Sequence, residues 1–191
     1  MVKILEHLEL VTEHIPKPYH IKINVFNRQK VVNMLPPLHG PDVDFTIKLD
    51  KTKPLPKPSR PYHMNQEECA ECQRLLNEGL ESGLMEPSNP KCPIAAPMFF
   101  VWKKDRTQQP VIDYWKLNEI TIKDSYPLPC IDKMMDCIHG SEFFTKFNLK
   151  SGYNQICIQP GDKWKTTFMT PFGPFQMKVM TFSFANAPPC F

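Results

Sequence analysis

Apolar residues recur at helical spacing in the stretch that follows residue 61 of this 191-residue chain. The positions that share one helical face are Cys69, Cys72, Leu76 and Leu80. Asn65 and Glu68 stand three residues apart, the spacing of a capping box, and Gly83 follows the last apolar position. The pattern predicts a helix that begins after Asn65 and ends before Gly83.

A second stretch with helical spacing runs from about residue 129 to residue 139. Its apolar positions are Ile131, Met134, Met135 and Ile138. Gly140 follows and predicts the end of this helix. Asp132 and Asp136 stand one turn apart, and we interpret this pair as a solvated face rather than a catalytic dyad.

Extended segments alternate with these helices. Residues 98–102 and 110–114 predict two strands of a hairpin, joined by a polar turn at 105–108 with a basic tip. Further strands are predicted at 143–149, 155–159, 165–170 and 175–180. Helix, hairpin, helix and then antiparallel strands is the order of an α+β fold, not of a parallel doubly wound one.

Residues 1–58 are rich in proline, which predicts an arm ahead of the folded domain. Its prolines are closely spaced and leave only segments that are too short for helices. The whole chain has 21 prolines against 7 glycines. Only 21–26 and 45–49 could form short strands, the second with the alternation of an edge strand. The arm carries 9 Lys and Arg against 6 Asp and Glu, so the net charge of +3 arises there.

Seven cysteines at long intervals, without a secretory leader pattern, predict reduced thiols in an intracellular protein, with cytoplasm or nucleus left open. No apolar run approaches the roughly 18–20 residues that span a bilayer, so no membrane partner is expected. Cys69 and Cys72 have the spacing of zinc ligands. Without a second pair nearby, we interpret them as structural thiols on the apolar face of the first helix.

Four blocks together closely resemble the reverse transcriptases of gypsy-class LTR retrotransposons, and they fall in the family's order. They are residues 111–124, 144–156, 164–173 and 186–188. Several independent motifs in consistent order are far more specific than any one of them. The resemblance covers residues 59–191, and residues 1–58 resemble the connection between protease and polymerase in the family's Pol polyprotein.

The resemblance implies an α+β, right-hand polymerase fold with fingers and a partial palm, in which helices pack on an antiparallel sheet. It implies an RNA-directed DNA polymerase, a nucleotidyltransferase that adds deoxynucleotides to an RNA or DNA template-primer with two Mg²⁺ ions. The rest of the palm, an RNase H and an integrase would lie in other portions of such a polyprotein. This chain shows no RNase H or integrase pattern.

The chain departs from the family where the metal ions would bind. Asn148 stands where the family has its first catalytic aspartate, and no Asp-Asp pair for the second metal-binding hairpin occurs in the sequence. A neutral amide with one acceptor oxygen cannot bridge two Mg²⁺ ions as a carboxylate does. We therefore expect Asn148 to be non-functional as a ligand, Mg²⁺ not to bind productively, and the chain alone to be inactive.

Five further positions align with the family's nucleotide pocket: Lys103, Lys104, Gln109, Tyr153 and Phe182. Gln109 replaces an arginine that would grip the triphosphate, and Trp115 replaces a second one. Tyr153 aligns with the aromatic residue that excludes a ribose 2′-hydroxyl. Four of these residues also have an interpretation without nucleotide binding. The lysines could form a solvated hairpin tip, and Tyr153 and Phe182 could be ordinary packing residues.

Two other hypotheses stay open from the sequence. The chain could be a non-catalytic module that binds template-primer duplexes through the basic hairpin, which predicts binding that falls steeply with salt. It could also be a decayed gene product without a selected function, with unpaired sheet edges and apolar surface left exposed.

Overall fold

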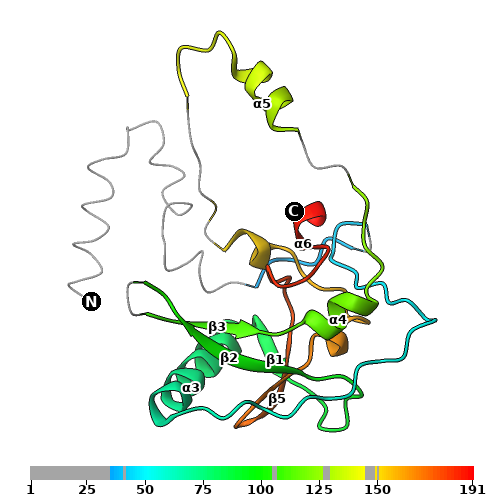
Figure 1. Ribbon diagram of the computed structural model, residues 1–191, viewed down its shortest axis with the longest axis vertical. Helices are drawn as coiled ribbons and strands as arrows, with labels where there is room; N and C mark the ends of the chain where they lie inside the picture. The colour runs from blue at the N-terminus through cyan, green and yellow to red at the C-terminus, as the bar shows by residue number, and fades with distance from the viewer. Residues whose placement is uncertain (1–34, 41, 105–106, 127–129, 145–148, 150) are drawn as a thin grey trace.

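The computed structural model describes residues 35–40, 42–104, 107–126, 130–144, 149 and 151–191. A five-stranded sheet has the order β1-β5-β4-β2-β3. Its strands are β1 (Met85–Pro87), β2 (Ala96–Trp102), β3 (Gln108–Ile112), β4 (Phe168–Thr170) and β5 (Gly173–Met177). All pairs are antiparallel except β2 with β4, which run parallel through Ala96 and Phe168. The α+β prediction is confirmed, with one parallel pair that it did not include (Figure 1).

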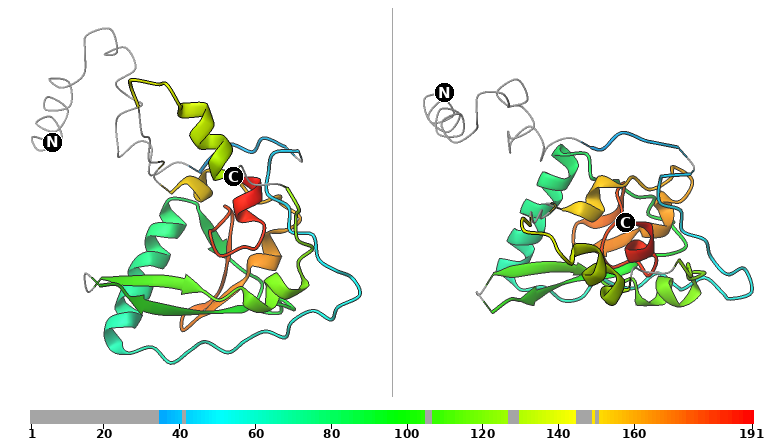
Figure 2. Two further views of the ribbon diagram at one scale, coloured as in Figure 1. Left: turned by 45° about the horizontal axis from the view of Figure 1, so that its top comes forward. Right: turned by 90° about the horizontal axis from the view of Figure 1, so that it is seen from above.

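Helix α3 (Gln66–Glu81) lies where the capping box predicts it, beside the β2–β3 hairpin (Figure 2). The Asn65 side chain accepts a hydrogen bond from the Glu68 amide, and the Glu68 carboxylate accepts one from the Asn65 amide, both at 2.8 Å. The predicted apolar face is only partly buried. Cys72 and Leu76 are inside, whereas Leu80 is exposed.

The predicted hairpin forms, with β2 slightly longer and β3 ending earlier than expected. Val101 lies opposite Gln109, and Trp102 opposite Gln108. Tyr114, expected in the second strand, instead precedes the six-residue helix α4 (Trp115–Ile120), which the sequence pattern did not predict. The basic tip lies partly outside the described residues, since Asp105 and Arg106 are not among them.

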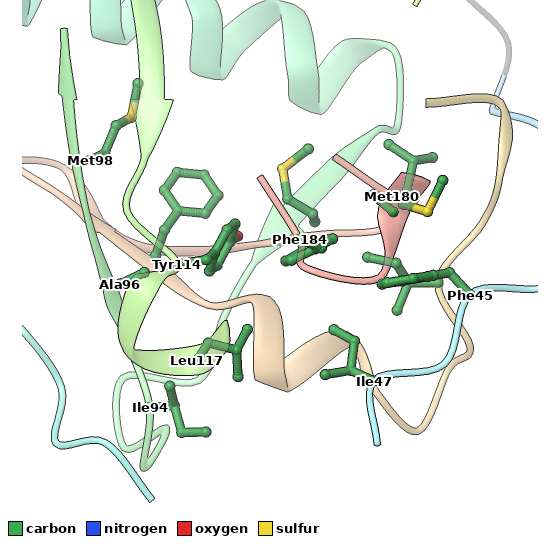
Figure 3. Close-up of a cluster of buried hydrophobic side chains, with 14 of the residues drawn as sticks. Phe45, Ile47, Ile94, Ala96, Met98, Tyr114, Leu117, Met180 and Phe184 are labelled. Carbon is green, nitrogen blue, oxygen red and sulfur yellow. The ribbon is translucent and has the colours of Figure 1, made fainter. Parts of the chain in front are cut away.

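Part of the proline-rich arm belongs to the core. Phe45 and Ile47 are 3% and 2% exposed. The Phe45 ring stacks on Phe184 at 5.5 Å, and Tyr114 contacts the same ring at 4.6 Å (Figure 3). The boundary at residue 58 stays a prediction; within the arm, the side chains of Phe45 and Ile47 lie in the core. Although the arm is rich in proline, these two alternating apolar side chains pack into the core.

Two polar side chains hold this arm segment in place. The Asp162 carboxylate accepts a hydrogen bond from the Ile47 amide at 2.7 Å, and the Lys165 ammonium donates to the Ile47 carbonyl at 2.7 Å. Lys165 also pairs with Asp162. Residues 45–49 form no strand, only single bridges from Phe45 to Ile158 and from Leu49 to Thr121. The other predicted arm strand, at 21–26, lies outside the described residues.

The second half of the chain has less strand than predicted. The segment 165–170 begins as the 3₁₀ turn η3 (Lys163–Thr166), and only Phe168–Thr170 is β4. The reason is local: the hydroxyls of Thr166 and Thr167 donate to carbonyls three residues back, at 2.7 Å each, and so favour a turn. The strand predicted at 155–159 is absent, and this segment forms only isolated bridges. The strand predicted at 175–180 is present as β5, which begins at Gly173 and ends at Met177.

Helix α5 (Ile131–Ile138) lies where its apolar spacing predicts, away from the sheet (Figure 1). Its apolar stripe is exposed, with Ile131 at 76% and Met135 at 59%. Phe143 and Phe144, predicted to start a strand, are in no strand and are also exposed. The rest of that predicted strand is outside the described residues, apart from Leu149.

Candidate nucleic-acid interface

The hairpin carries the first predicted site residues. Lys103 and Lys104 follow β2 and are exposed, and the Lys103 amide donates to the Thr107 carbonyl at 2.9 Å to close the turn. Gln109 is half-buried on β3. These side chains therefore stand on one hairpin, with the two cations in solvent and Gln109 set back along the strand.

Tyr153 and Phe182 line a common cavity of about 680 Å³ between α3, the sheet and the 3₁₀ turn η2 (Gly152–Gln155). Ser151 leads into η2 with a φ of 50°. The half-buried Tyr153 ring lies 5.1 Å from the Phe191 ring, and Phe182 is 57% exposed. The structure brings these two predicted residues together. It does not bring Lys103, Lys104 or Gln109 to the lining of this cavity.

The cavity is largely apolar and has no cation on its lining. Leucine and methionine side chains from α3, β1, β2 and β5 contribute to its apolar lining, and its charged members are the carboxylates Glu78 and Glu81. Thr181 contributes a hydroxyl that is buried and has no hydrogen-bond partner within the described part of the chain. Such a cavity suits a sugar or a base better than a triphosphate, which needs converging positive charge.

The predicted metal position, Asn148, lies outside the described residues. Where the chain is described, no group of three or more His, Cys, Asp or Glu side chains is placed to hold a metal ion. Cys69 and Cys72 are free thiols. Burial raises the pKa of the Cys72 thiol to about 11, and the neighbouring Cys69 adds to the shift.

A second and larger hollow, of about 880 Å³, lies beside the β2–β3 hairpin and α4. We call it the hairpin groove. Three aromatic residues line it: Phe99 from β2, Tyr114, which is buried, and Trp115 from the start of α4. Lys53 and Lys123 are its cations. Sequence reasoning missed the hairpin groove, since it treated Trp115 only as the loss of an arginine and did not single out Phe99.

Trp115 is held so that its indole remains available. Next to it, the buried Tyr114 hydroxyl donates to the Thr166 carbonyl at 2.6 Å, which anchors the start of α4 in the core. The Asp113 carboxylate accepts from the Trp115 amide at 3.0 Å. The indole N–H donates to the Glu119 carboxylate at 2.8 Å, yet the side chain is 70% exposed. The indole is therefore positioned but uncovered.

The side chains of two asparagines, Asn118 and Asn186, hydrogen-bond to backbone groups of residues that line the hairpin groove. The Asn118 amide donates to the Ser183 carbonyl at 2.9 Å and accepts from the Ala185 amide at 3.0 Å. The Asn186 amide donates to the Ile122 carbonyl at 2.8 Å and accepts from the Asp124 amide at 3.0 Å. These bonds join α4 and the segment after it to the turn that carries Phe182. Ile112 and Ser183 line both the hairpin groove and the Tyr153–Phe182 cavity, so the two hollows adjoin.

The carboxylates of the hairpin groove are already engaged within the protein. Asp113 and Glu119 both hold Trp115. Asp50 accepts from the Thr52 hydroxyl and amide, and these hydrogen bonds hold the pKa of the Asp50 carboxyl below its usual range. Lys53 donates to the Glu119 carbonyl at 2.9 Å. The lining has three carboxylates against two lysines and so no excess of positive charge, and its distinctive chemistry is exposed aromatic surface.

No helix among the described residues has the length and apolar character needed to cross a bilayer. No protein-family model matches the chain. The chain is 39% identical over 135 residues to the transposon Tf2-3 and Tf2-7 polyproteins of Schizosaccharomyces pombe. The match covers 71% of this chain but only 9% of each polyprotein.

Solved structures with the same fold include the protease–reverse transcriptase of prototype foamy virus, with a TM-score of 0.66 and 17% identity. The alignment covers 98% of this chain and 26% of that one. A foamy viral protease–reverse transcriptase in complex with double-stranded DNA gives the same TM-score at 16% identity, covering 98% of this chain and 34% of that one. At these identities the likeness shows the fold.

Proposed function

This chain is a retrotransposon Pol-like segment with a reverse-transcriptase-like fold, and we propose that it supplies the fingers and part of the palm of a gypsy-class, RNA-directed DNA polymerase. It spans about 9% of the length of the curated relatives that it matches. In this proposal its own residues bind the template strand, and they do not complete a polymerase active site.

The observation that carries the proposal is the hairpin groove with its positioned, 70% exposed Trp115. Proteins bind single strands by stacking bases on aromatic side chains and placing cations near the backbone, and each stack contributes about 1–3 kcal/mol. Phe99 and Trp115 offer the stacking surface, and Lys53 and Lys123 offer the charge. Because every base has a face that can stack on an aromatic ring, we expect binding with little sequence preference.

The proposal of inactivity rests on residue chemistry. Position 148 is asparagine, and the sequence has no Asp-Asp pair. Two Mg²⁺ ions, when bound in such a polymerase, activate the primer hydroxyl and stabilise the leaving pyrophosphate. A neutral amide oxygen does not fit a position that calls for a carboxylate, so we propose that the residues present do not hold the two metal ions.

The Tyr153–Phe182 cavity supports a limited role toward deoxynucleotides. Its apolar lining can accept a sugar or a base, but no lysine or arginine lines it. Lys103 and Lys104 stand apart on the hairpin, and Gln109 cannot replace the guanidinium that grips a phosphate. We therefore propose that the chain binds template far better than it binds free deoxynucleotides.

The test is fluorescence anisotropy with a labelled single-stranded oligonucleotide and a Trp115→Ala variant. Loss of one stacking surface should raise the Kd roughly 5- to 150-fold. Phe172→Ala is the matched control, because Phe172 is also an exposed aromatic residue but does not line the groove. Absence of binding by the wild-type chain, or equal affinities of wild type and Trp115→Ala, would overturn the proposal.

A further inference from the structure

The chain that leads from the arm into α3 is extended and rich in proline. We call residues 54–61 the proline segment, because prolines stand at positions 54, 56, 58 and 61. The segment belongs to no helix or strand, and it runs along the outside of the molecule ahead of α3 (Figures 1 and 2). Nothing in the metal, nucleotide or template chemistry considered above involves it.

The sequence restricts the backbone of the proline segment to an extended, polyproline II type of helix. Each of the four prolines has its φ fixed at about −65°. Leu55, Lys57 and Arg60 each precede a proline, which disfavours the α-helical region for them. Ser59 belongs to neither group, and its amide donates to the Ala95 carbonyl at 2.8 Å. The extended conformation is therefore set before any partner binds.

Burial within the segment follows the three-residue period of a polyproline II helix. Pro56 and Ser59 are half-buried and line a hollow of about 290 Å³ against the domain. Tyr62, the next position in this series, lines the same hollow, and its ring meets the Phe99 ring edge-on with 5.9 Å between the centroids. One edge of the segment therefore rests on the domain, whereas the residues of its other two edges are exposed.

The two exposed edges differ in chemistry. Leu55, Pro58 and Pro61 form an apolar edge, on which Leu55 is 46% exposed and no residue lines the hollow. Lys57 and Arg60 make the neighbouring edge basic. Neither cation forms an ion pair with a carboxylate in the described ranges. The segment thus presents proline rings on one edge and two free positive charges on the other.

The spacing of these residues suits one kind of groove. Pro58 and Pro61 stand three residues apart, so the dipeptides Lys57-Pro58 and Arg60-Pro61 repeat once per turn. Segments with this PxxP spacing dock into grooves lined by aromatic side chains, and their preset backbone lowers the entropic cost of binding. A groove that receives both dipeptides contacts the two exposed edges and not the edge that rests on the domain. The two cations call for carboxylates beside it, because complementary charge favours the encounter and sets its register.

We propose that the proline segment is a docking site for a small protein domain of the SH3 type, whose groove is lined by aromatic side chains and flanked by carboxylates. The partner binds the Leu55–Pro58–Pro61 edge through its aromatic groove and Lys57 and Arg60 through its carboxylates. This inference is independent of template binding in the hairpin groove, and it gives the arm a role in recruiting another protein.

The experiment titrates the full chain with a panel of purified SH3 domains that carry carboxylates beside the groove, and measures binding by isothermal titration calorimetry. Pro58→Ala with Pro61→Ala removes the rings of the apolar edge, and Lys57→Gln with Arg60→Gln removes the charges. Pro90→Ala and Lys91→Gln are the matched controls, because both residues are exposed and lie outside the proline segment. Thermal melts establish that each variant is folded. A synthetic peptide of residues 53–62 is titrated in parallel.

At least one domain of the panel should bind the chain with one-to-one stoichiometry. The double proline variant should raise the Kd roughly tenfold or more, because it loses both the docked rings and the preset backbone. The double charge variant should raise the Kd roughly tenfold at low salt and less at high salt. The controls should bind as wild type does. The peptide should bind no more tightly than the chain, because the domain already holds the segment extended.

Absence of binding to every domain of the panel would overturn the inference. An affinity that is unchanged by Pro58→Ala with Pro61→Ala would also overturn it, because charge attraction alone would then account for the binding. A peptide that binds while the full chain does not would show that the partner needs the edge that rests on the domain, which contradicts the geometry argued above.

Discussion

The Asn118 side-chain amide donates a hydrogen bond to the Ser183 carbonyl at 2.9 Å, across 65 residues of sequence. The same side chain accepts from the Ala185 amide at 3.0 Å. One asparagine therefore joins α4, which carries Trp115, to the turn that carries Phe182. Ser183 lines both the hairpin groove and the Tyr153–Phe182 cavity, so this connection lies where the two hollows meet.

Asn118→Ala should lower the free energy of unfolding by about 2–3 kcal/mol, because two hydrogen bonds are lost and two backbone groups are left without partners. Urea denaturation measures it. Asn77→Ala on the exposed face of α3 is the control and should cost under about 1 kcal/mol. A similar small cost for Asn118→Ala would show that the connection does not stabilise the fold.

Substitution of threonine by valine should have opposite effects on stability at positions 181 and 167. The Thr181 hydroxyl is buried without a partner in the described part of the chain, so Thr181→Val should be neutral or should stabilise by about 1 kcal/mol. The Thr167 hydroxyl donates to the Trp164 carbonyl and contacts the Ser88 hydroxyl, both at 2.7 Å. Thr167→Val should therefore destabilise by about 1–2 kcal/mol. Thermal or urea unfolding that ranks the two variants the other way would contradict these environments.

The Cys72 thiol should make the free energy of unfolding fall at high pH. Burial raises the pKa of its thiol from 9.0 to about 11, so the folded state favours the neutral form. This contribution is fully present below pH 9.0 and is lost as the pH rises from 9.0 toward 11. Cys72→Ala should reduce the fall over that window, as measured by urea midpoints at each pH. A slope identical to that of wild type would show that another group is responsible.

The exposed stripe on α5 should tolerate charge. Met134 and Met135 are 55% and 59% exposed, so changing both to lysine should alter the free energy of unfolding by less than about 1 kcal/mol. The same change in the core, Met180→Lys at a position with 0% exposure, should prevent stable folding. A large loss from the α5 changes would mean that this face is packed in solution.

The sequence predicted the elements whose signals are local. The capping box of Asn65 and Glu68 fixes the start of α3, and the apolar runs around the basic turn predict the hairpin. Helix α4 was missed because six residues carry less than two turns of periodicity, and its start depends on the tertiary anchor of Tyr114. The strand predicted at 165–170 failed at Thr166, where hydroxyl-to-carbonyl bonds favour a turn.

The candidate site was less accessible from sequence than the fold. Tyr153 and Phe182 were singled out through resemblance, and the structure places both on one cavity. The hairpin groove combines residues from the arm, the hairpin and α4. No single segment carries this combination, so the groove could be recognised only once those segments were placed side by side.

The most direct measurement places a labelled primer-template with a single-stranded 5′ overhang, Mg²⁺ and deoxynucleotides with the purified chain, and follows binding by anisotropy and extension on a gel. The account predicts overhang-dependent binding that falls with salt and with Trp115→Ala, and no extended primer. Extension above a mock preparation would contradict the proposed inactivity of a chain with Asn148, and absence of binding would contradict the template-binding role itself.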